Sequence, residues 1–86
     1  MEQNRINHIL AVADKMRKNA EKFGVDPDDA YLVGYLHDIG YEYIRSMHNK
    51  TGGSILEKNG FKYWKEIYYH GDTNPPYKSA MLNLLN

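Results

Sequence analysis

Apolar side chains recur at three- and four-residue spacing along most of this chain, and that spacing predicts helices rather than strands. The pattern is clearest over residues 4–23, where its members are Ile6, Ile9, Leu10, Ala13, Met16, Ala20 and Phe23. Gly24 follows as the expected C-terminal cap of this helix. No useful length of alternating apolar and polar residues is present, so the sequence predicts an all-helical fold.

The strongest helix start is at residues 26–29. Asp26 is the expected N-cap, Pro27 stands at the first helical position, and acids follow where the helix dipole favours them. This helix should run to about His37 and has apolar or small residues on almost every side, so we expect it to be the buried central helix. Small residues on one face would let another helix approach closely, and that face is made by Ala30, Val33, Gly34 and His37.

Three further helices are expected, over His48 to about Asn59, Phe61 to His70, and Tyr77 to Asn86. Residues 41–47 should form a connection or a short irregular helix, and residues 71–76 the clearest loop. The adjacent Gly52 and Gly53 indicate close packing or the approach of a ligand, although an irregular helix start explains them equally well. The expected architecture is a compact single-domain bundle of about five helices over residues 1–86, with the last helix cut short at Asn86.

Charge balance and the absence of cysteine exclude several classes of function. Eleven basic residues balance eleven acidic ones, so the net charge gives no indication of nucleic acid or an anionic membrane as partner. Disulfides, thiolate metal sites and a cysteine nucleophile are excluded because the chain has no cysteine. No apolar run has the length of a signal peptide or a membrane span, so a cytoplasmic location is the simplest interpretation. A core this small would also be compatible with a homo-oligomer.

Side chains that can bind a metal lie near the ends of the expected helices. His37 and Asp38 are adjacent at the end of the second helix, and the remaining histidines are His8, His48 and His70. An adjacent pair is weak evidence alone, because neighbours on a helix point about 100° apart. His8 lies at the flank of the apolar stripe of the first helix, so close packing of that helix would bring it to the pair.

The order Arg5-x-x-His8, His37-Asp38-Ile39-Gly40, His48 and His70 resembles the HD superfamily of metal-dependent phosphohydrolases, over essentially the whole chain. The resemblance implies an all-helical domain in which His8, His37 and Asp38 bind a divalent metal. It also implies that His48 and His70 help to hold a second metal or the substrate phosphate.

The chemistry of these side chains agrees with that implication. Imidazoles and a carboxylate suit manganese, iron, cobalt or zinc, with magnesium as a further candidate, and three protein ligands leave positions for water and substrate. A metal lowers the pKa of bound water, which supplies a nucleophile at neutral pH. With the roles that the resemblance implies, the expected catalytic residues are Asp38, His48, His70 and Arg5. Arg5 serves as a phosphate contact or in a structural salt bridge, whereas Lys50 is expected to be a solvated charge.

One departure from the family pattern bears on catalysis. The pattern has an aspartate on the fifth helix, and this sequence reaches Asn86 without one. Asp72 is the only later acid, and its place in a loop gives no reason to assign that role to it. Three explanations remain open: the sequence is a shortened version of a longer chain, the site has three protein ligands plus solvent, or a partner supplies the fourth ligand.

The expected function is hydrolysis of a phosphate ester of a small molecule, with a nucleotide as the leading candidate, by metal-activated water. Two alternatives remain open. One is a non-catalytic HD-like module that binds a metal or a nucleotide and lacks the distal aspartate. The other is a metal-dependent oxygenase, since a few proteins of similar ligand pattern carry out redox chemistry.

Overall fold

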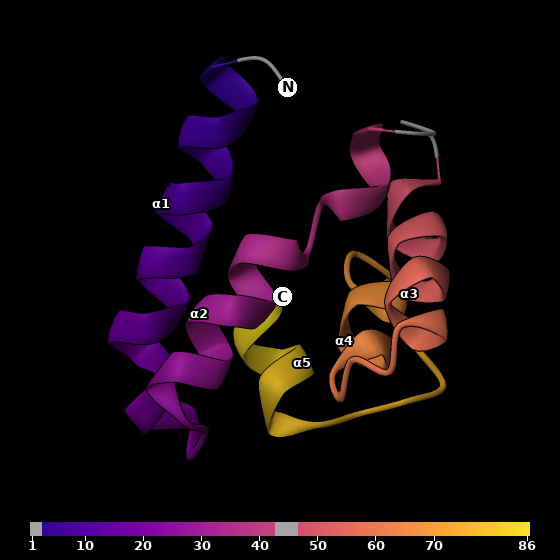
Figure 1. Ribbon diagram of the computed structural model, residues 1–86. Coiled ribbons are helices and arrows are strands. Elements are labelled where there is room, and N and C mark those ends of the chain that lie inside the picture. Colours follow the sequence, from indigo (N-terminus) through magenta and orange to yellow (C-terminus); the bar gives the residue numbers. More distant parts are fainter. Residues whose placement is uncertain (1–2, 43–46) are drawn as a thin grey trace.

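The computed structural model describes residues 3–42 and 47–86 (Figure 1). Five α-helices follow one another within these ranges: α1 (Gln3–Asn19), α2 (Pro27–Leu36), α3 (His48–Lys58), α4 (Trp64–Tyr69) and α5 (Ala80–Leu85). Two 3-10 helices, η1 (Ala20–Phe23) and η2 (Ile39–Glu42), extend α1 and follow α2. No strand occurs in the two described ranges, so the prediction of an all-helical bundle of about five helices is confirmed. Of the predicted connection at 41–47, residues 43–46 lie outside the described residues.

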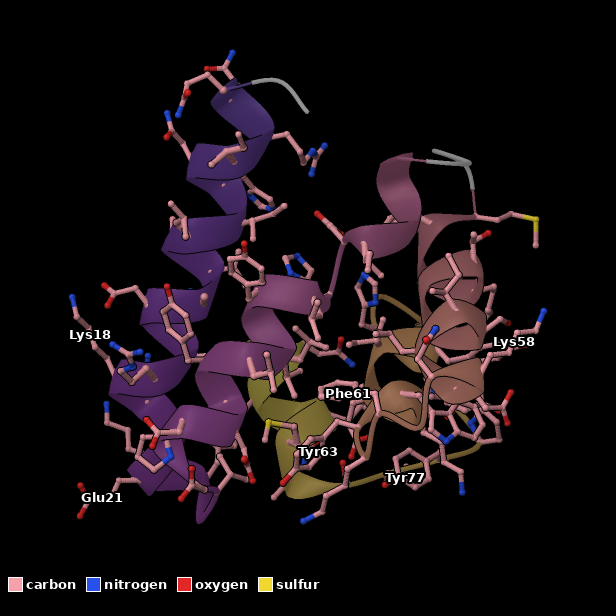
Figure 2. The ribbon with its side chains drawn as sticks, viewed as in Figure 1. Lys18, Glu21, Lys58, Phe61, Tyr63 and Tyr77 are labelled. Carbon is pink, nitrogen blue, oxygen red and sulfur yellow. The ribbon has the colours of Figure 1, made fainter. Side chains whose placement is uncertain are left out.

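The helices form two pairs with α5 between them (Figure 1). α1 packs along α2, and α3 packs on α4 and on η2. α5 contacts helices of both pairs, and the aromatic rings of Phe61 and Tyr63 also lie between the pairs (Figure 2). The buried core that joins the elements consists of Met16, Ala20, Ala30, Val33, Leu56, Ile67 and Met81. The ends of several helices therefore meet where the two pairs face each other.

Glycines allow both pairs to pack closely. A Cβ atom on Gly34 would lie 2.7 Å from the Cα atom of Ala13, so α1 approaches α2 as the small residues predicted. A Cβ atom on Gly53 would lie 2.5 Å from the Cβ atom of Tyr68, and one on Gly52 would lie 3.0 Å from the backbone nitrogen of Gly40. The Gly52-Gly53 pair lies inside a regular helix and serves close packing, against η2 on one side and α4 on the other.

The predicted signals around residues 24–29 are confirmed. Gly24 has a φ of 70°, and its backbone N–H caps the end of η1. Asp26 Oδ1 accepts hydrogen bonds from the backbone N–H groups of Asp28 (2.9 Å) and Asp29 (3.0 Å), and Pro27 stands at the first helical position. Asp29 in turn accepts a hydrogen bond of 2.7 Å from the hydroxyl of Tyr63, which raises the pKa of Tyr63 to about 12.

The prediction that α2 is the buried central helix is wrong. Only one of its faces is buried, because Leu32 and Tyr35 are 44% and 50% exposed on the other. The buried face carries the residues predicted to share it, namely Ala30, Val33, Gly34 and His37. α2 therefore packs from the side, and the core lies between the two pairs rather than around α2.

The last two helices begin later than predicted. α4 begins at Trp64 rather than Phe61, and α5 begins at Ala80 rather than Tyr77. The second shift has a clear cause: Ser79 Oγ accepts from the N–H of Leu82 (3.0 Å) as N-cap and donates to Glu66 Oε2 (2.8 Å). The hydroxyl of Tyr77 donates to the same buried carboxylate oxygen of Glu66 (3.1 Å). These contacts hold residues 77–79 outside the helix.

Candidate metal centre

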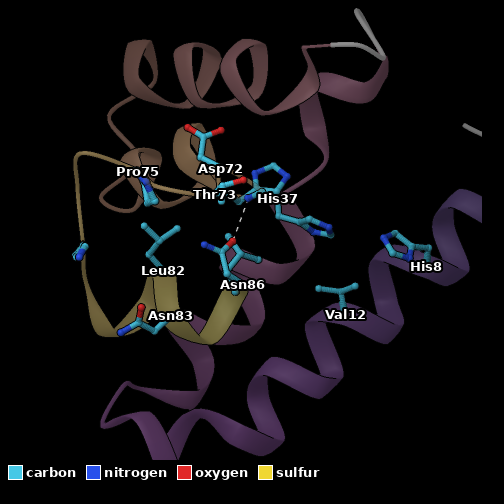
Figure 3. Close-up of a pocket in the computed structure, with 13 residues that line it drawn as sticks. His8, Val12, His37, Asp72, Thr73, Pro75, Leu82, Asn83 and Asn86 are labelled. Carbon is cyan, nitrogen blue, oxygen red and sulfur yellow. Dashed lines mark hydrogen bonds between the residues drawn. The ribbon is translucent and has the colours of Figure 1, made fainter.

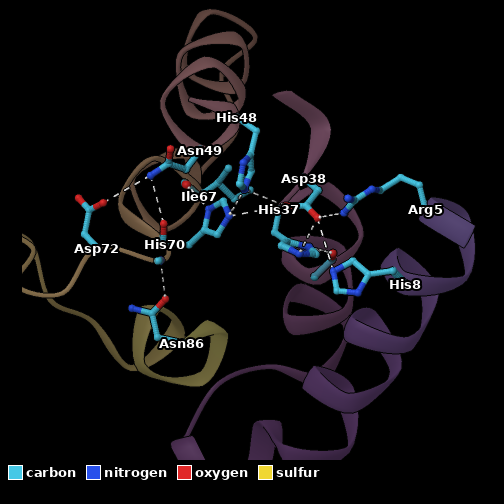
Figure 4. A network of polar contacts seen from close by, with 12 residues as sticks. Arg5, His8, His37, Asp38, His48, Asn49, Ile67, His70, Asp72 and Asn86 are labelled. Atoms are coloured by element: carbon cyan, nitrogen blue, oxygen red, sulfur yellow. Dashed lines mark hydrogen bonds and ion pairs between the residues drawn. The ribbon is translucent and has the colours of Figure 1, made fainter. Parts of the chain in front are cut away.

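Four histidines and one aspartate converge where the two helix pairs face each other (Figure 4). His8 lies in the second turn of α1, His37 caps the C-terminal end of α2, and Asp38 follows it directly. His48 is the first residue of α3, and His70 caps the C-terminal end of α4. The structure thus brings together all five predicted metal and histidine positions.

Asp38 lies at the centre of this cluster, and its two carboxylate oxygens face different imidazoles. Oδ2 is 3.3 Å from Nε2 of His37 and 3.5 Å from Nε2 of His8. Oδ1 is 3.2 Å from Nε2 of His48 and 3.7 Å from Nε2 of His70. Two groups of donor atoms result, His8 with His37 and Asp38, and Asp38 with His48 and His70; within each group the atoms lie within 4.8 Å of one another.

Backbone carbonyls at two helix ends set the orientation of two imidazoles. Nδ1 of His37 contacts the carbonyl of Gly34, and Nδ1 of His70 contacts the carbonyl of Ile67. Both carbonyls belong to last helical turns, where the backbone lacks its usual partner. A neutral imidazole has one N–H, so donation through Nδ1 leaves a lone pair on Nε2 that points into the cluster. This is the arrangement that holds histidine ligands of metals in their binding tautomer.

The donor atoms fit a divalent cation. Nε2 of His48 and Nε2 of His70 are 3.1 Å apart, a separation at which a proton or a cation must lie between two lone pairs. Neutral nitrogen donors around a shared carboxylate are a ligand set suited to manganese, iron, cobalt or zinc. Three protein donors in each group would leave positions open for water or substrate.

Burial and charge shift the pKa values of the two adjacent residues. Burial lowers the pKa of His37 below its ordinary value, although the charge of Asp38 opposes this, so His37 is kept in the neutral form that binds metals. Burial alone would raise the pKa of Asp38. The imidazoles of His70, His37 and His48, which face its two oxygens, outweigh burial and lower the pKa of Asp38 to about 2.

Metal-free protein is expected to lose stability as the pH falls below about 6.5, the ordinary pKa of histidine. The unfolded state binds a proton at His37 more readily than the folded state does. Asp38 has a folded pKa of about 2 against 3.8 unfolded, so its contribution is present above pH 3.8 and is lost as the pH falls towards 2. That contribution is about 2 kcal/mol. Urea unfolding of chelator-treated protein at several pH values measures the effect; a free energy of unfolding that stays constant or rises in acid would contradict it.

Arg5 reaches the cluster from the first turns of α1. Its Nη1 donates to Asp38 Oδ2 at 2.8 Å, and its side chain is 22% exposed. Of the two roles that the sequence left open for Arg5, the structural salt bridge is therefore present. The guanidinium also lies at the edge of the cluster, beside a carboxylate that faces the candidate metal position (Figure 4).

The prediction that Lys50 is a solvated charge is wrong. Its Nζ pairs with Asp72 Oδ2 at 2.8 Å and donates to the carbonyl of Tyr68 at 3.1 Å. Asp72 lies on the opposite side of His70 from Asp38 and belongs to neither donor group found among the described residues (Figure 4). The position of Asp72 is therefore not that of a ligand to either group.

A cleft of about 810 Å³ opens from the cluster (Figure 3). One end is lined by His8, His37 and His70, and the walls are lined by Val12, Gly71, Asp72, Thr73, Pro75, Lys78, Leu82, Asn83, Leu85 and Asn86. Its volume is within the range of pockets that bind small molecules and cofactors. Sequence reasoning missed the cleft residues of α5, because nothing in a short helical pattern shows which of its polar residues will face a site.

The family model described as "HD domain" matches residues 5–84. The chain belongs to the HD domain family. HD domains bind divalent metals, and their superfamily of metal-dependent phosphohydrolases acts on phosphorylated substrates. No curated protein and no solved structure matched the chain. Within residues 3–42 and 47–86, no helix of this HD domain is long and apolar enough to cross a membrane.

Proposed function

We propose that this HD domain is a metal-dependent phosphohydrolase that cleaves a phosphate ester of a small molecule, with nucleotides as the first substrates to test. The observation that carries the proposal is the pair of donor groups that share Asp38 at the end of a cleft. A metal centre that only stabilised the fold would have a closed ligand set and no need of a cleft. We also propose that the chain acts as a single cytoplasmic domain, alone or as a homo-oligomer.

In this proposal His8, His37 and Asp38 hold one divalent ion, which is manganese, iron, cobalt, zinc or magnesium. When bound, such an ion lowers the pKa of a coordinated water and draws charge from a phosphoryl oxygen. His48 and His70 share Asp38 with the first group, so they hold either a second ion through Nε2 or a phosphate oxygen through an N–H group.

The remaining side chains orient the reactants. Arg5 holds Asp38 through the 2.8 Å ion pair and places its guanidinium where it can neutralise a phosphate oxygen. The phosphate would lie at the histidine end of the cleft, and the leaving group would extend along α5. Val12, Leu82 and Leu85 offer apolar contacts there. These side chains would thus hold the ester in a fixed position beside the metal, and holding reactants in the right geometry raises the reaction rate.

The second candidate is a binding module without turnover. α5 carries no aspartate or glutamate, so it contributes no carboxylate to either donor group. With fewer anionic ligands the site would still bind an ion or a nucleotide. In that case ligands would raise the thermal stability of the protein, but no phosphate would be released.

Phosphate release from a panel of phosphomonoesters and nucleotides tests the first candidate. We expect turnover with manganese or cobalt, its loss in a chelator, and its return when the metal is restored. Asp14→Ala is the control variant for substitutions in the metal centre. In the part of the chain described, Asp14 pairs only with Lys18, on the exposed side of α1. Metal binding without phosphate release would favour the binding module, and oxygen consumption with iron would favour the oxygenase. Protein that binds no metal would contradict the phosphohydrolase and the oxygenase.

A further inference from the structure

The two residues that follow His48, Asn49 and Lys50, contact the segment around His70, and Figure 4 shows the contacts of Asn49. Asn49 Nδ2 donates to the carbonyl of His70 at 3.2 Å and to Asp72 Oδ1 at 3.4 Å. Lys50 Nζ donates to Asp72 Oδ2 at 2.8 Å and to the carbonyl of Tyr68 at 3.1 Å. The first turn of α3 therefore binds the chain before, at and after His70.

The lysine is held by more than its ion pair. Its Nζ lies 4.5 Å from the ring centroid of Tyr68 and 4.8 Å from that of Tyr69, within the range of cation–π contacts. Both partners of the ion pair are partly buried, with Lys50 30% and Asp72 33% exposed. Several directional contacts at one amino group restrict its position more than a surface ion pair would. We call Asn49, Lys50 and Asp72 the α3 clamp.

The α3 clamp joins the two elements that carry His48 and His70. Within the described residues, these histidines make up the half of the site that the α3–α4 pair supplies, and their Nε2 atoms are 3.1 Å apart. Two donors can share one ligand only when they are held within about 0.5 Å of the productive geometry. Asn49 holds the carbonyl of His70, and Lys50 holds Tyr68 and Asp72 on either side of it, so the two residues that follow His48 meet that requirement.

We propose that Lys50, Asn49 and Asp72 are positioning residues that hold His48 and His70 as one unit for a shared ligand. This proposal rests on the proposed role of His48 and His70 in holding a second ion or a phosphate. The α3 clamp touches neither His8 nor His37 in any contact described, so it acts on one donor group and leaves the other in place.

Binding of Co²⁺ to the full metal-free chain tests the proposal, with Asp72→Asn and Lys50→Met as variants and visible absorption and calorimetry as readouts. We expect the second equivalent to bind about 10- to 100-fold more weakly in both variants, the usual cost of removing a partner that orients a ligand. The first equivalent should bind as in the unchanged protein. Lys50→Arg should restore the second equivalent, because a guanidinium also pairs with a carboxylate.

Asp14→Asn is the matched control, since it removes an exposed ion pair of 3.0 Å on α1 that has no contact with the site. Unchanged binding in Asp72→Asn and Lys50→Met would overturn the proposal, and so would equal losses at both equivalents with a lower melting temperature.

Imidazole ¹⁵N chemical shifts of the metal-free protein provide a readout that needs no second ion. There we expect the imidazole signals of His48 and His70 to shift in both variants, because Lys50 and Asp72 no longer join the segments that carry them, and unchanged signals would overturn the proposal. Failure of the unchanged protein to bind a second equivalent of Co²⁺ or inorganic phosphate would instead contradict the function proposed for His48 and His70.

Discussion

Asp38→Ala is expected to remove both metal-binding groups in one step. Asp38 is the only residue that belongs to both groups found in the described part of the chain, with one oxygen directed at each pair of imidazoles. Its loss should lower the affinity for each ion by more than about 100-fold, because removal of an outer partner of a ligand already costs 10- to 100-fold. Any phosphate release should fall to background. Elemental analysis of purified protein and calorimetric titration with Mn²⁺ measure the effect.

Single histidine variants provide the comparison. His8→Ala should weaken the first group alone, and His48→Ala the second group alone, because each histidine belongs to one group. Circular dichroism should show a folded helical protein in all three variants. An Asp38→Ala protein that keeps its metal content and activity would exclude the proposed centre. Equal effects of His8→Ala and His48→Ala would instead indicate one merged site.

Gly53→Ala is expected to destabilise the fold, although alanine is the better helix former. On propensity alone the change would stabilise a helix interior by about 1 kcal/mol. Here the added Cβ would lie 2.5 Å from the Cβ atom and 2.6 Å from the Cα atom of Tyr68, so α3 and α4 would have to separate. Overpacking of this kind costs about 3 kcal/mol. In a domain of this size that lowers the melting temperature by more than about 10 °C.

Ser54→Ala is the control for Gly53→Ala, since it introduces alanine at the next position of the same helix. It should be neutral or slightly stabilising. Thermal unfolding followed by circular dichroism measures both variants. A Gly53→Ala protein that melts at or above the temperature of the unchanged protein would show that α3 and α4 can separate without cost, and the close contact would then carry no stability.

Features that depend on neighbours in the sequence were predictable. Gly24 and Asp26 act within one helical turn of their own positions, so residue type alone indicates their role. The buried face of α2 was predictable for the same reason, because helical periodicity places Ala30, Val33 and Gly34 together. The grouping of the four histidines with Asp38 was predicted from the resemblance to the HD superfamily, and the structure brings these five side chains together.

Features that depend on distant contacts were not predictable. Leu32 and Tyr35 are apolar or aromatic yet exposed, because exposure depends on which helices pack against α2. Glu66 holds residues 77–79 out of α5 through hydrogen bonds that connect positions 11 and 13 residues away. Lys50 reads as a surface charge in the sequence, and only the fold brings Asp72 to it.

The site too has features that depend on local sequence and features that depend on contacts between distant segments. The caps at residues 24–29 and the types of metal-binding side chain follow from local spacing and side-chain chemistry, which the sequence carries directly. The sharing of Asp38 between two donor groups, the α3 clamp and the cleft along α5 arise when distant segments come together, such as those of His8 and His70, which are 62 residues apart. Side-chain distances across such a gap depend on the packing of all the helices between, and no pattern within one helix records them.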